Sequence, residues 1–232
     1  MMLKTYSAFY YGIEVTEFNR FLDFQDADGN WTAKLDLGGY TLTQVAKEVR
    51  RAMNASGTSK RYLVSVDRVT RKIKIKSQDL SNFSLRFGTG PNASLSCASL
   101  LGFPASNTAS LNEHESTDSI GKVYKPQFFL QNYLPPEMNK TPIGASVNTS
   151  ASGRFVEVIG YNENRVFRFD IRFITNEPQA SGSLIKNNQN AIEDTLDFLD
   201  YVTNGNAIEF MPNESDPYSF YQGILISTSS NS

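Results

Sequence analysis

Residues 83–103 read FSLRFGTGPNASLSCASLLGF and close a longer stretch, 21–103, that has the pattern of a compact α+β module. Phe83, Leu85 and Phe87 alternate with other residues, as the side chains of a strand do when only one of its faces is buried. The quoted residues therefore predict the last strand of the module. The sequence of these residues is distinctive, yet it contains no set of side chains that could catalyse a reaction.

The chain is predicted to turn after this strand. Gly88-Thr-Gly-Pro91 is a turn sequence, and neither a Walker lysine nor the third glycine of a dinucleotide fingerprint follows at the spacing that phosphate binding requires. Ala93–Leu101 then predicts one or two helical turns. Gly102 is expected to end them in the left-handed conformation, with apolar Phe103 behind it.

Two hairpins precede the strand. Phe21–Gln25 and Trp31–Leu37 flank Asp28-Gly-Asn30, which tolerates the positive φ of a tight turn. Tyr62–Val66 and Lys72–Lys76 form the second hairpin, and its outgoing strand alternates lysine with isoleucine. That alternation predicts a half-buried strand that resists edge-to-edge pairing, because its isoleucines face the core and its lysines face water.

A helix is predicted between the hairpins. Thr41 and Gln44 have the spacing of a capping box, in which each side chain satisfies a backbone N–H group of the other residue. Five apolar residues then recur at helical spacing: Leu42, Val45, Ala46, Val49 and Met53. Four charged residues are expected mostly on the opposite face: Lys47, Glu48, Arg50 and Arg51. One side of this helix is therefore predicted to be buried.

The second half of the chain combines irregular stretches with strands. Ala105–Gly121 is polar and is expected to mark the exit from the first module. Gln131–Ser152 is rich in Pro and Ser, so it is predicted to be an irregular loop and a candidate arm between subunits. Phe155–Ile159 and Val166–Phe173 predict two strands joined by a turn at Asn162–Asn164.

Asn187–Asn204 predicts the second main helix, which ends at Gly205. Its buried stripe is expected to contain Ile192, Leu196, Leu199 and Val202. Its exposed side carries four acidic residues: Glu193, Asp194, Asp197 and Asp200. Two final strands, Ala207–Met211 and Phe220–Ser227, are predicted on either side of a turn that two prolines stiffen.

The predicted fold class is α+β and β-rich, with two modules of antiparallel strands and one main helix in each. The first module covers residues 1–118, and the second covers 119–232 with the helix at 187–204. An arrangement in which the first module is inserted into the second stays open. With 232 residues, of which 40% are hydrophobic and 20% charged, the chain has an ordinary globular composition.

Charge and composition argue against several partners. The net charge of −2 gives no general electrostatic reason to bind nucleic acid or an anionic membrane. No apolar run approaches the roughly 20 residues of a membrane-spanning helix, and the first residues lack the apolar core of a signal peptide. The single cysteine, Cys97, precludes an internal disulfide. Synthesis and folding in a reducing cytoplasm are therefore predicted.

Two residues are considered as a catalytic base or nucleophile, and neither is favoured. His114, the only histidine, lies between Glu113 and Glu115 in a polar stretch, where a solvated and protonated side chain is expected. Cys97 is expected to pack in the core as a small apolar side chain. Two such residues are too few for a zinc site. The chain is predicted not to be an enzyme, with no catalytic, cofactor-binding or metal-binding residues and no cofactor.

Clusters of charge are interpreted as solvated surfaces and turns. The carboxylate pairs that a glycosidase would need are Glu14 with Glu17, Asp194 with Asp197, and Glu214 with Asp216. A calcium loop is only faintly indicated by Asp23, Asp26 and Asp28, because Leu37 replaces the bidentate glutamate. A basic run could contact nucleic acid or the acidic helix of a neighbouring copy: Lys60, Arg61, Arg68, Arg71, Lys72, Lys74 and Lys76.

Two stretches resemble structural proteins of tailed bacteriophage particles. Trp31–Phe103 contains TAKLDLGGYTLTQVAKEVRRAMN, YLVSVDRVTRKIKI and FGTGPNASLSCASLLGF, and it is similar to a module that recurs in virion proteins of the tail and its tip. Asp194–Thr228 is similar to the closing helix and strands of distal tail or baseplate proteins, in which a Pro-Asn/Asp-acid-x-Asp-Pro turn follows an aromatic strand.

The resemblance implies a structural subunit of a phage tail, a ring-forming distal tail or baseplate component that links the tail tube to the tip or fibres. It implies copies of the same chain as partners, in a hexameric ring, and adjacent tube, hub and fibre proteins. No nucleic-acid partner and no membrane insertion are expected. The chain would act in the virion after synthesis in the cytoplasm of the bacterial host.

Other functions stay open. A receptor- or carbohydrate-binding module of the particle could stack aromatic side chains on sugars, with candidates Trp31, Tyr40, Tyr10 and Tyr11. A structural protein of the neck between head and tail is a further alternative. A polysaccharide depolymerase would need two carboxylates in one cleft, with candidates Glu14, Glu17, Glu214 and Asp216.

Overall fold

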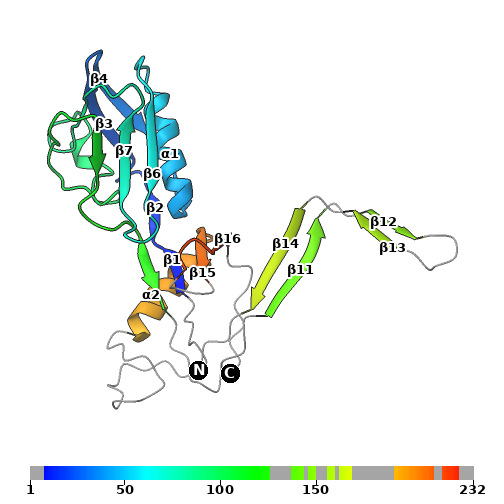
Figure 1. Ribbon diagram of the computed structural model, residues 1–232. Helices are drawn as coiled ribbons and strands as arrows, with labels where there is room; N and C mark the ends of the chain where they lie inside the picture. Colours follow the sequence, from blue (N-terminus) through cyan, green and yellow to red (C-terminus); the bar gives the residue numbers. More distant parts are fainter. Residues whose placement is uncertain are drawn as a thin grey trace. The chain divides into compact units, whose positions relative to one another are not determined.

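The computed structural model confirms a mixed α+β fold that is rich in antiparallel strands (Figure 1). It describes residues 8–125, 137–143, 146–149, 156–159, 162–168, 191–211 and 216–224. Contacts divide the chain into two compact units. The first unit comprises Met1–Lys125 with Glu193–Ser232, and the second comprises Pro126–Ile192. The domain boundary expected between residues 118 and 119 stays a prediction.

Two small antiparallel sheets and helix α1 (Leu42–Asn54) enclose the main core of the first unit. One sheet has the order β4-β3-β8, with strands Gly29–Lys34, Phe21–Asp26 and Ser84–Leu85. The other has the order β6-β7-β9, with strands Tyr62–Val66, Ile73–Ser77 and Glu113–Glu115. Helix α1 lies against β6 and β4 (Figure 1). Both predicted hairpins, β3–β4 and β6–β7, are confirmed.

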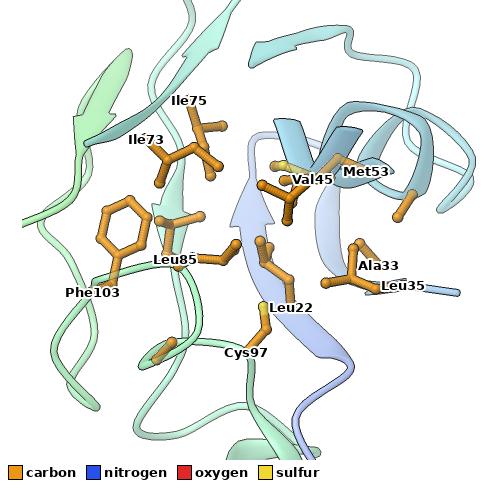
Figure 2. Packing of buried hydrophobic residues seen from close by; sticks show 14 of the residues in the cluster. Leu22, Ala33, Leu35, Val45, Met53, Ile73, Ile75, Leu85, Cys97 and Phe103 are labelled. Atoms are coloured by element: carbon orange, nitrogen blue, oxygen red, sulfur yellow. The ribbon is translucent and has the colours of Figure 1, made fainter. Parts of the chain in front are cut away.

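Side chains from both sheets and from α1 meet in the main core. Figure 2 shows Leu22 of β3, Val45 and Met53 of α1, and Ile75 of β7 converging on the same interior. All four side chains are fully buried. Burying an aliphatic side chain of this size contributes about 1.5–3 kcal/mol. The alternation of isoleucine and lysine therefore decides which face of β7 turns inward.

The capping box of α1 is confirmed. The Thr41 hydroxyl accepts a hydrogen bond from the Gln44 N–H at 3.3 Å, and the Gln44 side chain accepts one from the Thr41 N–H at 2.9 Å. The five apolar residues predicted to face inward are buried. Glu48 is buried as well, because its carboxylate accepts hydrogen bonds from Arg51 and from the backbone N–H of Asp36. A buried carboxylate is thus tolerated on this helix because hydrogen-bond donors surround it.

The stretch 83–103 is less regular than predicted, although its side chains point as expected. Only Ser84–Leu85 form strand β8, which pairs with β3 over two residues. Phe83, Leu85 and Phe87 are nevertheless all buried. The alternation of apolar residues therefore predicts the buried face correctly but overstates the length of the strand.

The predicted helical turns are a short 3₁₀ turn, η1 (Ala93–Leu95), and a separate turn that ends at Gly102. Gly102 has a φ of +71° and donates its N–H to the Ser99 carbonyl at 3.2 Å. The N–H of Phe103 donates to the Ala98 carbonyl at 2.9 Å. These two hydrogen bonds define a Schellman motif, and the apolar residue behind it is buried as predicted.

The polar stretch Ala105–Gly121 belongs to the fold, and the expectation that it marks an exit from the module is wrong. Its residues Glu113–Glu115 form β9, which pairs with β7 and makes β7 a central strand. Lys74 and Lys76 of β7 form ion pairs with Glu113 across this ladder. The sequence pattern missed the strand because its inward side chain is a histidine between two glutamates.

A second core of the first unit is aromatic. Four strands pair in the order β10-β1-β15-β16, with bounds Lys122–Tyr124, Ala8–Tyr11, Ile208–Met211 and Tyr221–Gly223. Helix α2 (Ala191–Thr203) packs against them. The ring centroid of Phe198 lies 5.0 Å from that of Phe9 and 4.4 Å from that of Tyr124. Within the described residues, both predicted C-terminal strands are confirmed, whereas the helix start expected at Asn187 lies outside them.

Helix α2 buries a different face from the one predicted. Phe198 and Tyr201 are buried, whereas Leu196 is 60% exposed and Ile192 is 42% exposed. Of the predicted stripe, only Val202 is fully buried, although the four acidic residues are exposed as expected. The aromatic side chains of α2 face inward because their rings pack on the aromatic rings of β1 and β10.

Two antiparallel strand pairs lie in the described residues of the second unit. Strand β11 (Glu137–Ile143) pairs with β14 (Asn162–Arg168), and β12 (Ser146–Thr149) pairs with β13 (Val156–Ile159) (Figure 1). The prediction that Gln131–Ser152 is irregular is therefore wrong for the residues of β11 and β12. Its role as an arm between subunits stays a prediction.

The strand pairing of the second unit also corrects a predicted hairpin. Asn162–Asn164 lie inside β14 and are not a turn, and β13 and β14 pair with different strands. Pro142 lies in β11 opposite Glu163. Strands β13 and β14 each pair with a strand of the segment 131–152, although the Pro- and Ser-rich composition of that segment argues against regular structure. The turn-like sequence Asn162–Asn164 therefore predicted the wrong pairing, and the Pro- and Ser-rich composition hid the true partners.

Candidate functional site

His114 is a buried core residue, and the expectation of a solvated and protonated side chain is wrong. The residue is 5% exposed, and its Nε2 lies 2.9 Å from the Phe83 carbonyl oxygen. Burial lowers the pKa of His114, and the carbonyl groups of Phe83 and Leu111 oppose this shift without cancelling it. Glu113 and Glu115 turn away from the ring, because neighbouring residues of a strand point to opposite faces. The histidine therefore acts as a packing residue.

Cys97 is fully buried in the main core, as predicted. Figure 2 shows its side chain beside Leu22. Burial raises the pKa of the Cys97 thiol well above its ordinary range, so the thiol stays protonated. This position agrees with the interpretation of the residue as a small apolar side chain.

Of the aspartates considered for a calcium loop, Asp23 and Asp26 serve separate hydrogen-bond networks, and the Asp28 N–H donates to Asp26. Asp26 accepts a hydrogen bond from the Trp31 indole N–H at 2.8 Å, and the hydroxyl groups of Thr58 and Tyr62 donate to it at 2.6 and 2.9 Å. Burial by itself raises the pKa of Asp26, but these donors outweigh it and lower the pKa. Asp23 is buried against other donors. Among the described residues, no group of three or more His, Cys, Asp or Glu is arranged to hold a metal ion.

Carboxylates considered for glycoside hydrolysis are held by partners within the first unit. Glu17 forms an ion pair at 2.7 Å with an arginine of the same turn. Asp197 accepts hydrogen bonds from the Tyr11 hydroxyl and from Lys122, both at 2.7 Å. Glu214 lies outside the described residues. Glu17 therefore holds a local turn, and Asp197 ties α2 to β1 and β10.

One shallow hollow does bring two of these carboxylates together. It has a volume of about 210 Å³ and is lined by Tyr11, Gly12, Glu14, Lys122, Asp197, Asp200, Tyr201 and Asn204. The hydrogen bonds from Lys122 and Tyr11 lower the pKa of Asp197. A general acid at neutral pH needs a raised pKa. The hollow therefore gives Asp197 the opposite of that property.

The basic run of the second hairpin is matched by groups of its own unit. Lys60 pairs with Asp79 at 2.9 Å, and Lys74 pairs with Glu113 at 3.0 Å. Arg71 donates to two main-chain carbonyl groups from Nη1. These contacts offset the positive field on which contact with nucleic acid depends. Contact of this hairpin face with the acidic helix of a neighbouring copy stays a prediction.

Arg68, from the same run, joins the hairpin loop to the C-terminal strands. Its Nη2 lies 2.5 Å from a carboxylate oxygen of Glu209 in β15, and its Nε donates to the Pro217 carbonyl at 2.6 Å. The guanidinium carbon lies 3.5 Å from the centroid of the Phe220 ring. Glu209 is fully buried and Arg68 is 8% exposed. Arg68 Nη1 is buried, and no described atom accepts a hydrogen bond from it.

This ion pair extends to the start of α1. Gln222 of β16 donates from Nε2 to the Thr41 hydroxyl at 2.9 Å and to Glu209 at 3.3 Å. Sequence reasoning missed the network, although a signal was present. Glu209 stands between Ile208 and Phe210 in an apolar strand, and a carboxylate at such a position requires a buried partner.

Aromatic side chains considered for sugar binding are engaged inside the first unit. Trp31 is half-buried against the main core, and its indole N–H is bound by Asp26. The Tyr40 hydroxyl donates to the Asp36 carbonyl at 2.8 Å. Tyr11 is buried. Their polar groups are therefore committed to the fold and do not converge on one surface that could orient a sugar.

A second and larger hollow lies beside α1. It has a volume of about 560 Å³ and is lined by Leu37, Gly38, Gly39, Tyr40, Gln44, Lys47, Glu48, Arg51 and Ala207. One edge is β5 (Gly38–Tyr40), which pairs with β2 (Ile13–Val15). Gly39 has no side chain, and a Cβ there would collide with Asn206. This close approach brings Ala207 to the rim of the hollow.

Comparison with known proteins leaves the geometry as the main guide to function. No protein-family model matches this chain, and no curated protein matches it. In the part of the chain that the structure describes, no helix has both the length and the apolar character needed to cross a membrane.

Proposed function

We propose that this chain is a structural subunit of a bacteriophage tail, a ring-forming component of the distal tail or baseplate that links the tail tube to the tip or fibres. The resemblance of Trp31–Phe103 and Asp194–Thr228 to virion proteins supports this proposal. Both stretches belong to the first unit, which carries the two helices over most of their length. In this proposal the chain functions by binding further copies of itself and the adjacent tail proteins.

The observation that carries the proposal is the strand pairing of the second unit. In the described part of this unit, β11 pairs with β14 and β12 pairs with β13, so each sheet has two strands. A two-stranded sheet is at best marginally stable by itself in water, and it gains stability from a further strand or an apolar surface. Neighbouring copies in a ring supply such a surface. Assembly and the stability of these strand pairs are then coupled.

The burial of the candidate reactive groups supports a binding role in a second way. His114 and Cys97 lie in the interior of the first unit, and Asp26 is surrounded by donors of the same unit. Acid–base and nucleophilic chemistry require such groups to reach a substrate. Their use as fold-forming residues favours a protein that acts through its surfaces.

The mass and shape of the purified full chain test the proposal. Size-exclusion chromatography with light scattering is expected to give a closed oligomer whose mass is a fixed multiple of 25.9 kDa. Negative-stain electron microscopy is expected to show rings. A chain that stays monomeric at every concentration contradicts the proposal.

The place of the chain in the particle needs a separate experiment. An antibody against the chain is expected to label the distal end of the tail in electron micrographs of virions. Labelling at the neck would favour the head-to-tail alternative instead. Virions that carry no label, although the antibody recognises the purified chain and the denatured particle proteins, contradict an exposed distal position.

A proline substitution tests the role of the second unit. Val158, the third residue of β13, stands opposite Val147 of β12. Val158→Pro removes a backbone N–H and fixes φ, so it is expected to break the strand pair and abolish the oligomer. Val158→Thr is the matched control, because a β-branched residue preserves the strand. An unchanged oligomer in the proline variant would show that this strand pair does not hold the ring.

A further inference from the structure

The hollow beside α1 has the character of a docking surface. Leu37, which lines it, is 49% exposed, and Tyr40 is fixed beside it by the hydrogen bond from its hydroxyl to Asp36. Arg51 is held by the carboxylates of Glu48 at 2.5 Å and Asp36 at 3.2 Å. The hollow therefore has an apolar floor, and the charge of one lining arginine is already matched.

One further cation of α1 lines this hollow, and a second lies next to that residue on the helix surface. Lys47 lines the hollow, and Arg50 lies one turn further along the same helix. Both side chains are exposed, and among the described residues no carboxylate forms an ion pair with either. The margin is therefore positive and open to a negatively charged partner.

The outer face of α2 has the complementary character. Leu196 is 60% exposed, and Asp200 lies one turn later on the same face. The Asp200 carboxylate is exposed and has no ion pair within the described chain. Asp197 of the same helix is already paired with Lys122, so Asp200 supplies the unmatched negative charge of this surface. An exposed leucine on an acidic helix face is suited to an apolar hollow with a basic margin.

We propose that the outer face of α2 in one copy docks into the hollow beside α1 of a second copy. Leu196 enters the hollow beside Leu37, and Asp200 meets Lys47 and Arg50. The occupant is identified by charge, because the acidic helix face complements the basic margin. The inference rests on the proposed function and adds, to the contact that the second unit supplies, a contact between the first units of neighbouring copies.

The contact is heterologous, because it joins two different surfaces of the same unit. Each copy offers one hollow and one helix face, so each copy binds one neighbour on either side. Contacts of this kind propagate from copy to copy and close into a ring when the rotation between neighbours divides a full turn. The inference assigns the positively charged partner surface to α1 and not to the second hairpin, three of whose lysines are paired with Asp79 and Glu113.

Substitutions in the full chain test this contact. Leu196→Asp removes the apolar anchor, and the double variant Lys47→Glu, Arg50→Glu reverses the margin. Each is expected to raise the dissociation constant, measured by sedimentation velocity, by at least about tenfold. Leu80→Asp is the matched control, because Leu80 is 58% exposed and lies on neither surface. Circular dichroism and thermal unfolding check that each variant folds.

Mixing the variants gives a sharper result. The Leu196→Asp chain keeps an intact hollow, and the double variant keeps an intact helix face. An equimolar mixture is therefore expected to form one-to-one dimers as its main species, because only one functional contact between α1 and α2 remains in each pair. The dimer is expected to weaken as salt rises, since exposed charges are screened.

The outcomes separate this inference from the proposed function. A parent chain that forms rings, together with variants whose mass is unchanged, overturns the contact and leaves the tail-ring proposal standing. A mixture that yields no dimer overturns the contact as well. A parent chain that is monomeric at every concentration overturns both.

Discussion

At the scale of single residues, His114 is the titratable group whose charge matters most near neutral pH. Its ring packs edge-on against Phe83 with centroids 4.5 Å apart, on the inward face of β9. Lys74 and Lys76 of the paired strand lie on the other face with the glutamates. A protonated imidazole would place a charge in the core without a carboxylate to match it.

The free energy of unfolding is therefore expected to fall between about pH 7.5 and 5.5. The pKa of His114 is lower in the folded chain than in the unfolded chain, so below about 6.5 protons bind preferentially to the unfolded state. The contribution of His114 is fully present above about pH 7.5 and declines as the pH falls through the pKa of the unfolded state. The loss in free energy of unfolding reaches at most about 1.4 kcal/mol at one pH unit below the pKa of the unfolded state. Urea denaturation at a series of pH values measures this loss.

The control for this prediction is His114→Gln, which keeps an N–H donor near the Phe83 carbonyl. It is expected to remove the pH dependence in this window, because the chain has no other histidine. Carboxyl groups with lowered pKa values, such as Asp26, titrate at lower pH and leave the window clear. A parent chain whose stability is flat across the window contradicts the prediction.

At the scale of elements, α1 depends on its N-terminal cap. Thr41 is 2% exposed, and its hydroxyl accepts hydrogen bonds from the Gln44 N–H and from Gln222. Thr41→Ala removes the acceptor and is expected to lower the free energy of unfolding by about 1–2 kcal/mol. Chemical denaturation followed by circular dichroism measures the change.

Thr41→Ser separates the cap from simple packing. Serine keeps the hydroxyl oxygen and loses only a methyl group, so it is expected to cost clearly less than alanine. Equal losses in the serine and alanine variants would mean that the methyl group, and not the cap, stabilises this end of the helix.

At the scale of the whole first unit, Arg68 and Glu209 connect the main core to the aromatic core. Glu209→Gln or Arg68→Met leaves a buried group without its partner and is expected to cost about 3–5 kcal/mol. The double variant Arg68→Met, Glu209→Met is expected to cost less than the sum of the single changes, because it leaves no buried charge. Thermal and urea unfolding measure the three values.

Hydrogen exchange locates the effect of this ion pair. In Glu209→Gln, the amide groups of β15 and β16 are expected to exchange faster, whereas those in the centre of α1 keep their protection. Additive losses in the two single variants, or a uniform rise in exchange across the unit, would show that the pair does not connect the two cores.

Local patterns determined the elements that depend on neighbouring residues. The spacing of Thr41 and Gln44, the turn at Asp28–Asn30 and the alternation in Lys72–Lys76 each predict what the structure contains. Gly102 predicts its left-handed turn in the same way. The physical reason is that capping, turn formation and strand alternation are decided within a few residues of the chain.

Tertiary structure alone decided the features that need distant partners. The buried His114, the aromatic face of α2 and the pair of Arg68 with Glu209 all depend on segments far apart in the sequence. The pairing of β11 with β14 is of the same kind. Helical spacing fixes the period of α2 but not which side turns inward, because that choice follows from the rings it meets. A polar residue is likewise buried or exposed according to the donors and acceptors that folding brings to it.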